Sequence, residues 1–505
     1  MIARKSALSV AILASNGILG YIALKFISLH MEPWEYGVIG FSFGFVSLFT
    51  IFGSFGFDLA HVKRISEGKN LGVCNGTYLT TKIILIGLFT TVVVGAVGIW
   101  RHFFGGEFES VYHEQAVFIM LAYFVLLAFS QSLVSTFNAR KETAKAQIPL
   151  LFYHIIRTAA TIYVARMHYG PIALAYTYVL GEIFHFIFAF YFFRKYPVSK
   201  PSLAYFKQYS KFALQMAVVV GTTMVIMNID KVFIQIFWTA QEVGEYFAVY
   251  NLSRFIAILA GAIGILILPT VSAYHSKKNM KEIQTLIVSA ERYLSMFAFP
   301  VIIFLVVLAK PIIPLLLSNR YENSLWIMYV LPFYVLLSVL SNPYQHQMQG
   351  MDMPHFTRNR VLIMLGVNIV FNLLLIPSEL PGLNIPLAGL GGLGAAITAV
   401  ITYGTGLVYI RIIVWKKTKI AGSSRIILHI FAATIMGLIL YFLSEMILIE
   451  RWFHLVIFGI LALEIYFGIL WMIKEFTIKD FDFILDTLNI RKMFFYVKDE
   501  IFSKK

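Results

Sequence analysis

Residues 78–100 read YLTTKIILIGLFTTVVVGAVGIW, and this stretch decides the fold class. Lys82 is the one charged side chain in it. In lipid, every backbone N–H and C=O group must be paired within its own element, and a helix of about 20 apolar residues crosses the hydrocarbon core. The stretch is therefore predicted to form a transmembrane helix.

The composition of the whole chain agrees with a lipid environment. The 505 residues are 59% hydrophobic and 13% charged, with a mean hydropathy of +0.78, whereas soluble domains contain about 25% charged residues. The formal net charge of +15 would favour a nucleic-acid partner only if the basic residues gathered on one solvated face. They are spread over many loops, so no nucleic acid is expected as a partner. The single cysteine, Cys74, excludes an intrachain disulfide and a multi-cysteine metal site.

Apolar runs of similar length occur along the rest of the chain, and each predicts one span. The first of them is too long for the core of a cleavable signal peptide. About fourteen spans result, at about 6–29, 36–57, 78–100, 115–136, 147–167, 171–193, 209–237, 246–272, 290–310, 325–347, 359–377, 391–415, 425–445 and 452–473.

Lys and Arg are unevenly distributed among the loops between these spans. Cytoplasmic loops retain basic residues, whereas translocated loops lack them. Alternate loops differ as this rule requires, so both termini are predicted to be cytoplasmic, the number of spans even, and the location the cytoplasmic membrane. The basic set contains Arg4, Lys5, Lys63, Arg64, Lys69, Arg140, Lys141, Lys145, Arg194, Lys195, Lys200, Lys207, Lys211, Lys277, Lys278, Lys281, Arg292, Arg358, Arg360, Lys416, Lys417, Lys419, Arg425 and Lys474, and the opposite set contains Arg101, Arg166, Arg320 and Arg451.

Two segments of the first half resemble segments of the second half. Residues 170–179 align without gaps with residues 391–400, and residues 25–37 resemble residues 231–244. Because six spans per half is an even number, both halves would insert in the same orientation, related by a pseudo-twofold axis along the membrane normal. The sequence thus predicts an all-α integral membrane protein with two six-helix bundles around a central cavity.

This repeat divides the chain into four predicted regions. No loop is long enough to form a catalytic domain outside the membrane. The tail carries apolar residues at helical spacing, which favours an amphipathic helix at the membrane interface. The regions are an N-terminal six-helix lobe (1–200), a C-terminal six-helix lobe (201–420), two additional transmembrane helices (421–474) and a cytoplasmic tail (475–505).

Three stretches resemble a known transporter family: Asn228-Ile-Asp-Lys231, EVGEYFAVY at residues 242–250 and GGLGAAITAV at residues 391–400. They are similar to the polysaccharide exporter branch of the multidrug/oligosaccharidyl-lipid/polysaccharide exporter superfamily, which includes the O-antigen and capsule repeat-unit flippases. The resemblance implies two six-helix bundles that form a V-shaped cavity, plus two added helices. It also implies a substrate, an oligosaccharide linked through pyrophosphate to a polyprenyl lipid, which moves from the cytoplasmic to the outer leaflet. Membrane lipid and proteins of polysaccharide assembly would be the partners.

Several ionisable residues fall inside the predicted spans, where a charge costs from about 2.5 to more than 10 kcal/mol and usually faces a protein cavity. Arg157 and Glu182 are about equally far from the turn at residues 168–170, so both are expected near the middle of the membrane. His154 and His185 lie one turn deeper on similar helix faces. These four side chains are candidates for one polar cluster.

A second group of charges is predicted in the outer half of the membrane. Asp230 and Lys231 come shortly before the outer turn at Trp238, and Arg254 follows that turn. Lys25 takes the related place in the first half. All these residues are therefore expected at a comparable depth.

The implied substrate gives these charges a role, because lipid solvates neither a pyrophosphate nor the hydroxyl groups of a sugar. Arginine offers paired hydrogen bonds to phosphate and lysine offers a point charge. The predicted contacts of the anionic head group are Arg157, Lys231, Arg254 and Lys25. The candidates for proton or sodium coupling, or for charge pairing, are Glu182, Asp230, His154 and His185, with the two acids preferred as carriers.

Other roles for these residues remain open. Lys25 would reach the membrane surface if it snorkels. Arg157 with Glu182, and Asp230 with Arg254, would neutralise each other if they form ion pairs between packed helices. The two histidines would then be hydrogen-bonded structural residues.

Two other functions remain as alternatives to the flippase. A drug or metabolite exporter of the same superfamily would require acidic residues to dominate the cavity, because its substrates are mostly cationic. A membrane enzyme that polymerises or ligates glycans would require a sizeable outer loop. The sequence contains no phosphate-binding glycine loop, no zinc-ligand spacing and no nucleophile elbow, so no catalytic residue, metal or cofactor is predicted.

Overall fold

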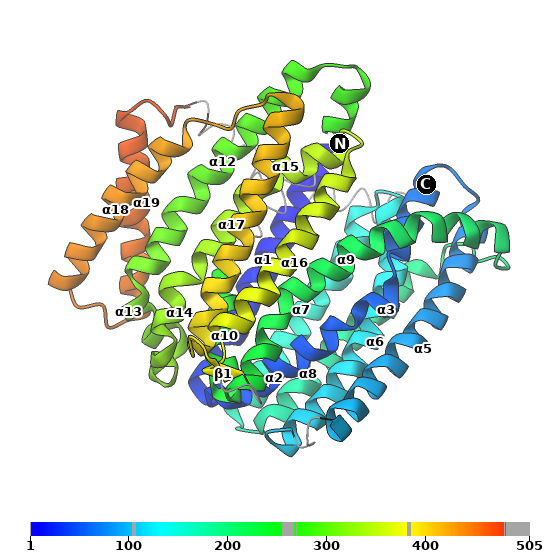
Figure 1. The fold of residues 1–505 in the computed structure, drawn as a ribbon, viewed down its shortest axis with the longest axis horizontal. Helices are drawn as coiled ribbons and strands as arrows, with labels where there is room; N and C mark the ends of the chain where they lie inside the picture. The colour runs from blue at the N-terminus through cyan, green and yellow to red at the C-terminus, as the bar shows by residue number, and fades with distance from the viewer. Residues whose placement is uncertain are drawn as a thin grey trace. The chain divides into compact units, whose positions relative to one another are not determined.

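The computed structural model describes residues 2–103, 108–254, 267–268, 270–380, 385–478 and 480, and nearly all of them are helical (Figure 1). The described chain forms two compact units. The first unit comprises Ala3–Gly244, and the second lies within Glu245–Arg491. An all-helical fold is what the apolar runs predicted.

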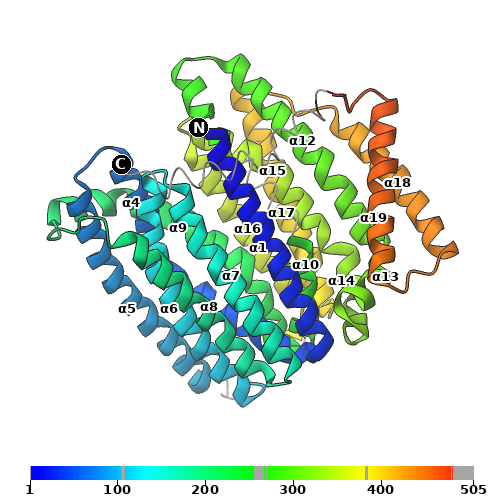
Figure 2. The same ribbon diagram turned by 180° about the vertical axis from the view of Figure 1, so that it is seen from behind.

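The first unit is a bundle of long helices. Figures 1 and 2 show α5, α6 and α8 side by side, and α7 forms a hairpin with α8. Its elements are α1 (Ile2–His30), α2 (Pro33–Leu48), α3 (Thr50–Ser54), α4 (Phe57–Ser66), α5 (Leu71–Phe103), α6 (Val111–Ala139), α7 (Thr143–Arg166), α8 (Gly170–Phe193), α9 (Leu203–Phe237) and the first turn of α10 (Ala240–Ser253).

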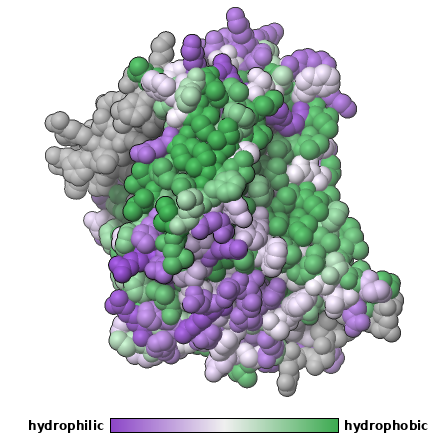
Figure 3. Space-filling model, turned by 90° about the vertical axis from the view of Figure 1, so that its left-hand side faces the viewer, coloured by the Kyte–Doolittle hydropathy of each residue, from purple (hydrophilic) through white to green (hydrophobic). Residues whose placement is uncertain are grey.

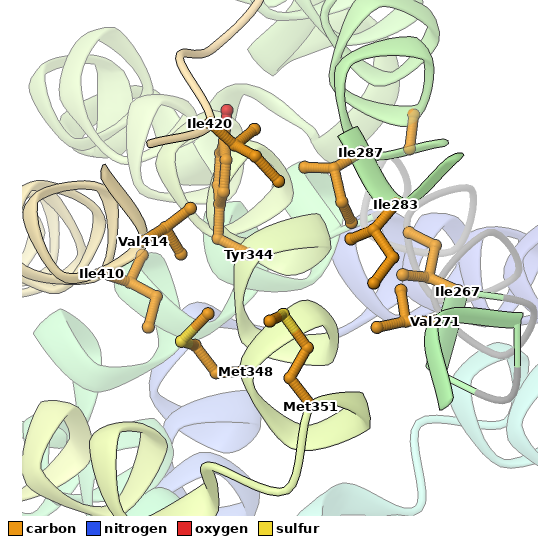
Figure 4. Packing of buried hydrophobic residues seen from close by; sticks show 11 residues of the cluster. Ile267, Val271, Ile283, Ile287, Tyr344, Met348, Met351, Ile410, Val414 and Ile420 are labelled. Carbon is orange, nitrogen blue, oxygen red and sulfur yellow. The ribbon is translucent and has the colours of Figure 1, made fainter. Parts of the chain in front are cut away.

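The second unit contains the remaining helices and one two-stranded antiparallel sheet, in which Glu379 pairs with Pro386. Its core is a cluster of apolar side chains from α12, α15 and α17, including Ile283, Met348 and Ile410 (Figure 4). The elements are the rest of α10, α12 (Met280–Val307), α13 (Ala309–Ile312), the π-helix η2 (Ile313–Leu317), the 3₁₀-helix η3 (Asn319–Ser324), α14 (Leu325–Val330), α15 (Pro332–Gly350), α16 (Pro354–Leu375), β1 (Glu379–Leu380), β2 (Ile385–Pro386), α17 (Gly391–Thr418), α18 (Ile426–Met446) and α19 (Trp452–Met472).

The described part of the chain contains 11 helices that are long and apolar enough to cross a membrane, or up to 12 if the bent pair at residues 33–66 counts as one span. Each coincides with a predicted span. Of the other two predicted spans, 6–29 lies in α1, and 246–272 runs into residues outside the described ranges. The total of fourteen therefore stays a prediction, as does the amphipathic tail beyond residue 480.

The surface over α18 and α19 is apolar. Ile427, Phe442 and Ile457 are more than half exposed. Figure 3 shows hydrophobic side chains gathered on this face of the molecule, with hydrophilic side chains towards both ends. Such a surface suits contact with lipid chains, and the chain is a multi-pass membrane protein.

Two glycines that the predicted repeat aligns have the same local structure. Gly170 opens α8 and Gly391 opens α17, and these aligned residues have positive φ angles of 78° and 52°. Side chains rarely adopt such angles, which favours glycine at both helix starts. Each glycine also begins the second helix of a hairpin, α7–α8 or α16–α17. The predicted lobe boundary near residue 200 stays a prediction, although α9 packs on α2 and α4 and belongs to the first unit.

An ion-pair network fastens α18 and α19 to α12 in the second unit. Arg292 of α12 donates to Glu475 from Nε at 2.6 Å and to Asp480 from Nη1 at 2.9 Å. Arg425 at the start of α18 also contacts Glu475, which is fully buried. Burial alone would raise the pKa of Asp480, but hydrogen bonds from Arg292, Thr477 and Tyr293 hold that pKa well below its usual value.

Replacing Arg292 by methionine is expected to lower stability by about 3–5 kcal/mol at neutral pH, because the change leaves Glu475 buried without this partner. Since the pKa of Asp480 is lowered in the folded state, its contribution is present above the unfolded pKa and is lost as pH falls through the folded value. The deficit of the variant should therefore shrink in acid. Thermal unfolding of the purified protein measures this loss of stability. Arg101→Met, which removes an exposed pair with Glu114, is the control and should cost less than about 1 kcal/mol.

Candidate functional site

Arg157 lies in the middle of α7, facing α8. Its guanidinium carbon is 3.7 Å from the centre of the Tyr178 ring. At this distance the face of the aromatic ring attracts the cation. The two helices approach closely because residue 181 is glycine: a Cβ there would lie 3.0 Å from the Cβ of Arg157. The hairpin therefore holds this arginine in a defined place.

The surroundings of Arg157 are aromatic rather than acidic. Tyr178 makes an edge contact with Tyr123 at 5.7 Å between ring centres, and the hydroxyl of Tyr153 lies 3.5 Å from that of Tyr123. Within the described ranges, Arg157 forms no ion pair, and its Nε atom has no hydrogen-bond partner. The half-buried positive charge is thus not neutralised by the described part of the chain.

Glu182 pairs with His185 instead of with Arg157. The Glu182 Oε1 atom is 2.8 Å from His185 Nδ1, and both residues are buried. The ring of Tyr153 lies between the two histidines, 4.8 Å from His154 and 6.3 Å from His185. The structure therefore brings the predicted cluster together as a histidine–carboxylate pair beside a separate arginine, and the alternative Arg157–Glu182 ion pair is absent from the described residues.

Asp230 and Lys231 are both buried on α9. The Lys231 ammonium donates to the carbonyl of Met227 at 3.0 Å. Its stem packs on α2, where a Cβ at Gly44 would be 3.3 Å from the Cβ of Lys231. Lys25 is half-buried on α1. The first unit thus contains three of the four predicted head-group contacts.

Arg254 follows the last turn of α10, in the second unit, and its side chain is exposed. Its guanidinium carbon is 5.4 Å from the ring centre of Tyr250, which stacks on Tyr334 at 5.6 Å with an interplanar angle of 3°. Tyr334 in turn contacts Tyr403 at 5.2 Å. In the described part of the chain, Arg254 has no ion-pair partner. Each unit therefore contains an arginine that contacts tyrosine rings.

Sequence reasoning missed a third arginine. Arg360, which was counted with the loop residues, is buried inside α16 and donates to the Gly406 carbonyl at 2.9 Å and to Ser341 Oγ at 3.1 Å. Its place as the second residue of the predicted span 359–377 was the signal that it does not belong to a loop. Lys82, in the stretch that decides the fold, is also buried.

Comparison with known proteins assigns the family. The family model described as "Polysaccharide biosynthesis protein" matches residues 30–325, more than half of the chain. The chain belongs to this family.

In the part of the chain that the structure describes, no group of three or more His, Cys, Asp and Glu side chains could hold a metal ion.

Three known proteins are similar to this chain in sequence or in fold. The chain is 20% identical over 399 residues to the probable low-salt glycan biosynthesis flippase Agl15 of Haloferax volcanii, covering 77% of this chain and 78% of that protein. Its fold matches the lipid II flippase MurJ with a TM-score of 0.70 and 16% identity over 90% of this chain and 97% of that one. A multidrug resistance MATE family transporter of the MOP superfamily matches with a TM-score of 0.60 and 15% identity, over 83% of this chain and 100% of that one. The predicted membership of a polysaccharide biosynthesis family is confirmed, and the solved structures share the fold of this chain.

Proposed function

We propose that this protein is a flippase that moves a polyprenyl-pyrophosphate-linked oligosaccharide from the cytoplasmic to the outer leaflet of the cytoplasmic membrane. The family, the flippase relative and the fold support a lipid-linked glycan as the substrate. The polyprenyl tail stays in lipid while the head group crosses through protein. Both termini lie in the cytoplasm, and the two repeat-related bundles alternate access to each side by rocking.

One observation carries this proposal: Arg157 holds a positive charge on tyrosine rings in the middle of an apolar hairpin, without an ion pair in the described residues. An unpaired charge within a membrane span is costly and persists only where something else stabilises it. A pyrophosphate supplies the missing negative charge and accepts paired hydrogen bonds from a guanidinium.

Arg254 offers the same chemistry in the second unit, and Lys231 and Lys25 add point charges in the first. In this proposal the four residues contact the head group at successive stages of its passage. The Glu182–His185 pair and Asp230, with His154 nearby on α7, couple the passage to a proton or sodium gradient. Proteins of polysaccharide assembly supply the substrate and remove it.

Deletion of the gene tests the proposed function. Lipid-linked oligosaccharide is expected to accumulate on the cytoplasmic leaflet, because no other route solvates its head group in lipid. The measurement is the fraction of the labelled glycan that an added, membrane-impermeant glycosidase reaches from outside intact cells. That fraction should fall on deletion and recover when the wild-type chain is expressed again. Unchanged access in the deletion strain would remove the flippase proposal.

A further inference from the structure

A pocket of about 320 Å³ lies in the second unit, beside the last turns of α17. Its inner wall belongs to the hydrophobic core, because Tyr344 of α15 and Ile420, which lie next to each other in Figure 4, are both buried. Arg411, Ile412 and Trp415 of α17 and Gly422 of the following loop also line it. A cationic group in a mostly apolar wall is a usual composition of a ligand site.

Arg411 is held in place at one edge of its guanidinium. Its Nη1 atom donates to Glu291 of α12, which is fully buried, and to the Tyr344 hydroxyl at 2.7 Å. The other oxygen of Glu291 accepts from the Ser423 backbone N–H at 2.6 Å, so the loop is tied to the same carboxylate. The Nε and Nη2 atoms of Arg411 have no acceptor among the described residues, and 37% of the side chain is exposed. These two donors therefore remain for a ligand.

Two lysines add positive charge beside the pocket. The ammonium of Lys419, which follows α17, is 4.7 Å from the centre of the Trp415 ring. Lys416 is exposed and lies one helical turn after Ile412, on the same face of α17. Neither lysine forms an ion pair within the described ranges. Because Glu291 already pairs with Arg411, the net charge around the pocket is positive and suits an anion.

Exposed apolar side chains lead along α17 to this pocket. Val408, Ile412 and Trp415 are 58%, 46% and 54% exposed, and their spacing of four and three residues places them on one helix face. Since α17 is long and apolar enough to cross a membrane, this face suits contact with acyl chains. Tryptophan and basic residues are typical of the place where a helix leaves the membrane. The pocket is therefore expected at the level of the lipid head groups.

We propose that this pocket binds the phosphate of an anionic phospholipid, such as phosphatidylglycerol, from the leaflet at this end of α17. The phosphate oxygens accept hydrogen bonds from Nε and Nη2 of Arg411, and Lys416 and Lys419 stabilise the negative charge. The acyl chains lie along Val408 and Ile412. A zwitterionic lipid such as phosphatidylcholine carries its own cation and gains less from these lysines.

Trp415 reports which lipid occupies the pocket. The full chain is reconstituted in liposomes of phosphatidylcholine and phosphatidylglycerol, in which one of the two lipids has brominated acyl chains that quench tryptophan on contact. Because the chain has seven tryptophans, the signal of Trp415 is the difference between each protein and the same protein with Trp415→Phe. Quenching by each brominated lipid at equal mole fraction gives the binding preference at Trp415.

The wild type is expected to prefer phosphatidylglycerol about tenfold at Trp415, and Lys416→Gln with Lys419→Gln to lower this preference to about twofold, because a basic residue near an anionic lipid contributes a factor of up to about five. Lys277→Gln with Lys278→Gln is the matched control. It removes the same charge from exposed residues that do not line the pocket, and should keep the wild-type preference. Arg411 is not replaced, because Glu291 would then be buried without this partner.

Three results would overturn the proposal. In the first, both brominated lipids quench Trp415 of the wild type equally. In the second, the preference is the same in the Lys416→Gln, Lys419→Gln protein as in its Lys277→Gln, Lys278→Gln control, which assigns it to general surface charge. In the third, an excess of inorganic phosphate abolishes the preference, which identifies a soluble phosphate as the ligand. Quenching requires no transport, so each result is independent of the flippase proposal.

Discussion

Replacing Gly37 by alanine is expected to lower the stability of the protein by more than about 3 kcal/mol, beyond the usual cost of overpacking. A Cβ at this position in α2 would lie 1.7 Å from the carbonyl oxygen of Ala240 in α10. Backbone, unlike a flexible side chain, cannot move aside locally. The two helices would have to separate along their length.

The same contact occurs in reverse from the other helix. A Cβ at Gly244 would lie 1.8 Å from the carbonyl oxygen of Pro33, so Gly244→Ala is expected to be equally damaging. The same sequence offset separates Gly37 from Gly244 and Pro33 from Ala240. The approach of Pro33–Gly37 to Ala240–Gly244 is thus symmetrical between two segments that the sequence analysis aligned, as small residues allow between membrane helices.

Thermal unfolding of the purified variants measures both effects. Gly87→Ala and Gly95→Ala on α5 are matched controls, because no atom lies within 4 Å of a Cβ at either position. These controls should be neutral or stabilising, since glycine in a helix is less favourable than alanine by about 1 kcal/mol. If the Gly37→Ala protein has the same midpoint of thermal unfolding as the wild type, Gly37 does not lie this close to Ala240.

The second large effect is expected at Arg157. Arg157→Met should slow flipping of the pyrophosphate-linked substrate about 100-fold, because hydrogen bonds from a charged donor are worth about 1.5–3 kcal/mol each. Arg157→Lys keeps the charge but loses the planar guanidinium. Its flipping rate should therefore lie between those of the wild type and Arg157→Met. Stability should stay the same or rise in Arg157→Met, since the change removes a half-buried charge that has no ion-pair partner in the described residues.

Arg166→Met is the matched control for Arg157, because Arg166 lies on the same helix but is exposed in its last turn, near Phe26. The Arg166→Met protein should flip the substrate at the wild-type rate. The measurement is the transport rate per folded molecule in proteoliposomes. Wild-type transport by Arg157→Met would remove Arg157 from the head-group path.

Much of the fold could be predicted because apolar runs and loop charges are local properties of the sequence. Gly170 and Gly391 are an example of what the sequence could predict. The sequence alignment paired these two residues, and each begins a helix with a left-handed φ angle. The spacing of Glu182 and His185 likewise placed them on one face, where they form a pair. Pairing on one helix follows from its periodicity alone.

Contacts between distant segments could not be predicted in this way. The apolar run at 36–57 did not predict the 50° bend between Pro33–Leu48 and Thr50–Ser66. The prediction therefore ended the span before Asp58, which pairs with Lys82 of α5 at 3.0 Å. Arg157 lies within the α7–α8 hairpin, but its contact with Tyr178 depends on the close approach that Gly181 permits, which the sequence did not predict. Such contacts depend on how helices pack, which hydrophobic periodicity does not specify.

The most direct test of the central claim compares two lipids that carry the same oligosaccharide, one through a pyrophosphate and one through an uncharged linker. Both are fluorescently labelled and reconstituted with the protein in liposomes, and their leaflet distribution is followed with a membrane-impermeant quencher. The account predicts that the wild type moves the pyrophosphate lipid much faster and that Arg157→Met loses this preference. Equal rates for the two lipids in the wild type would contradict a cationic path for the head group.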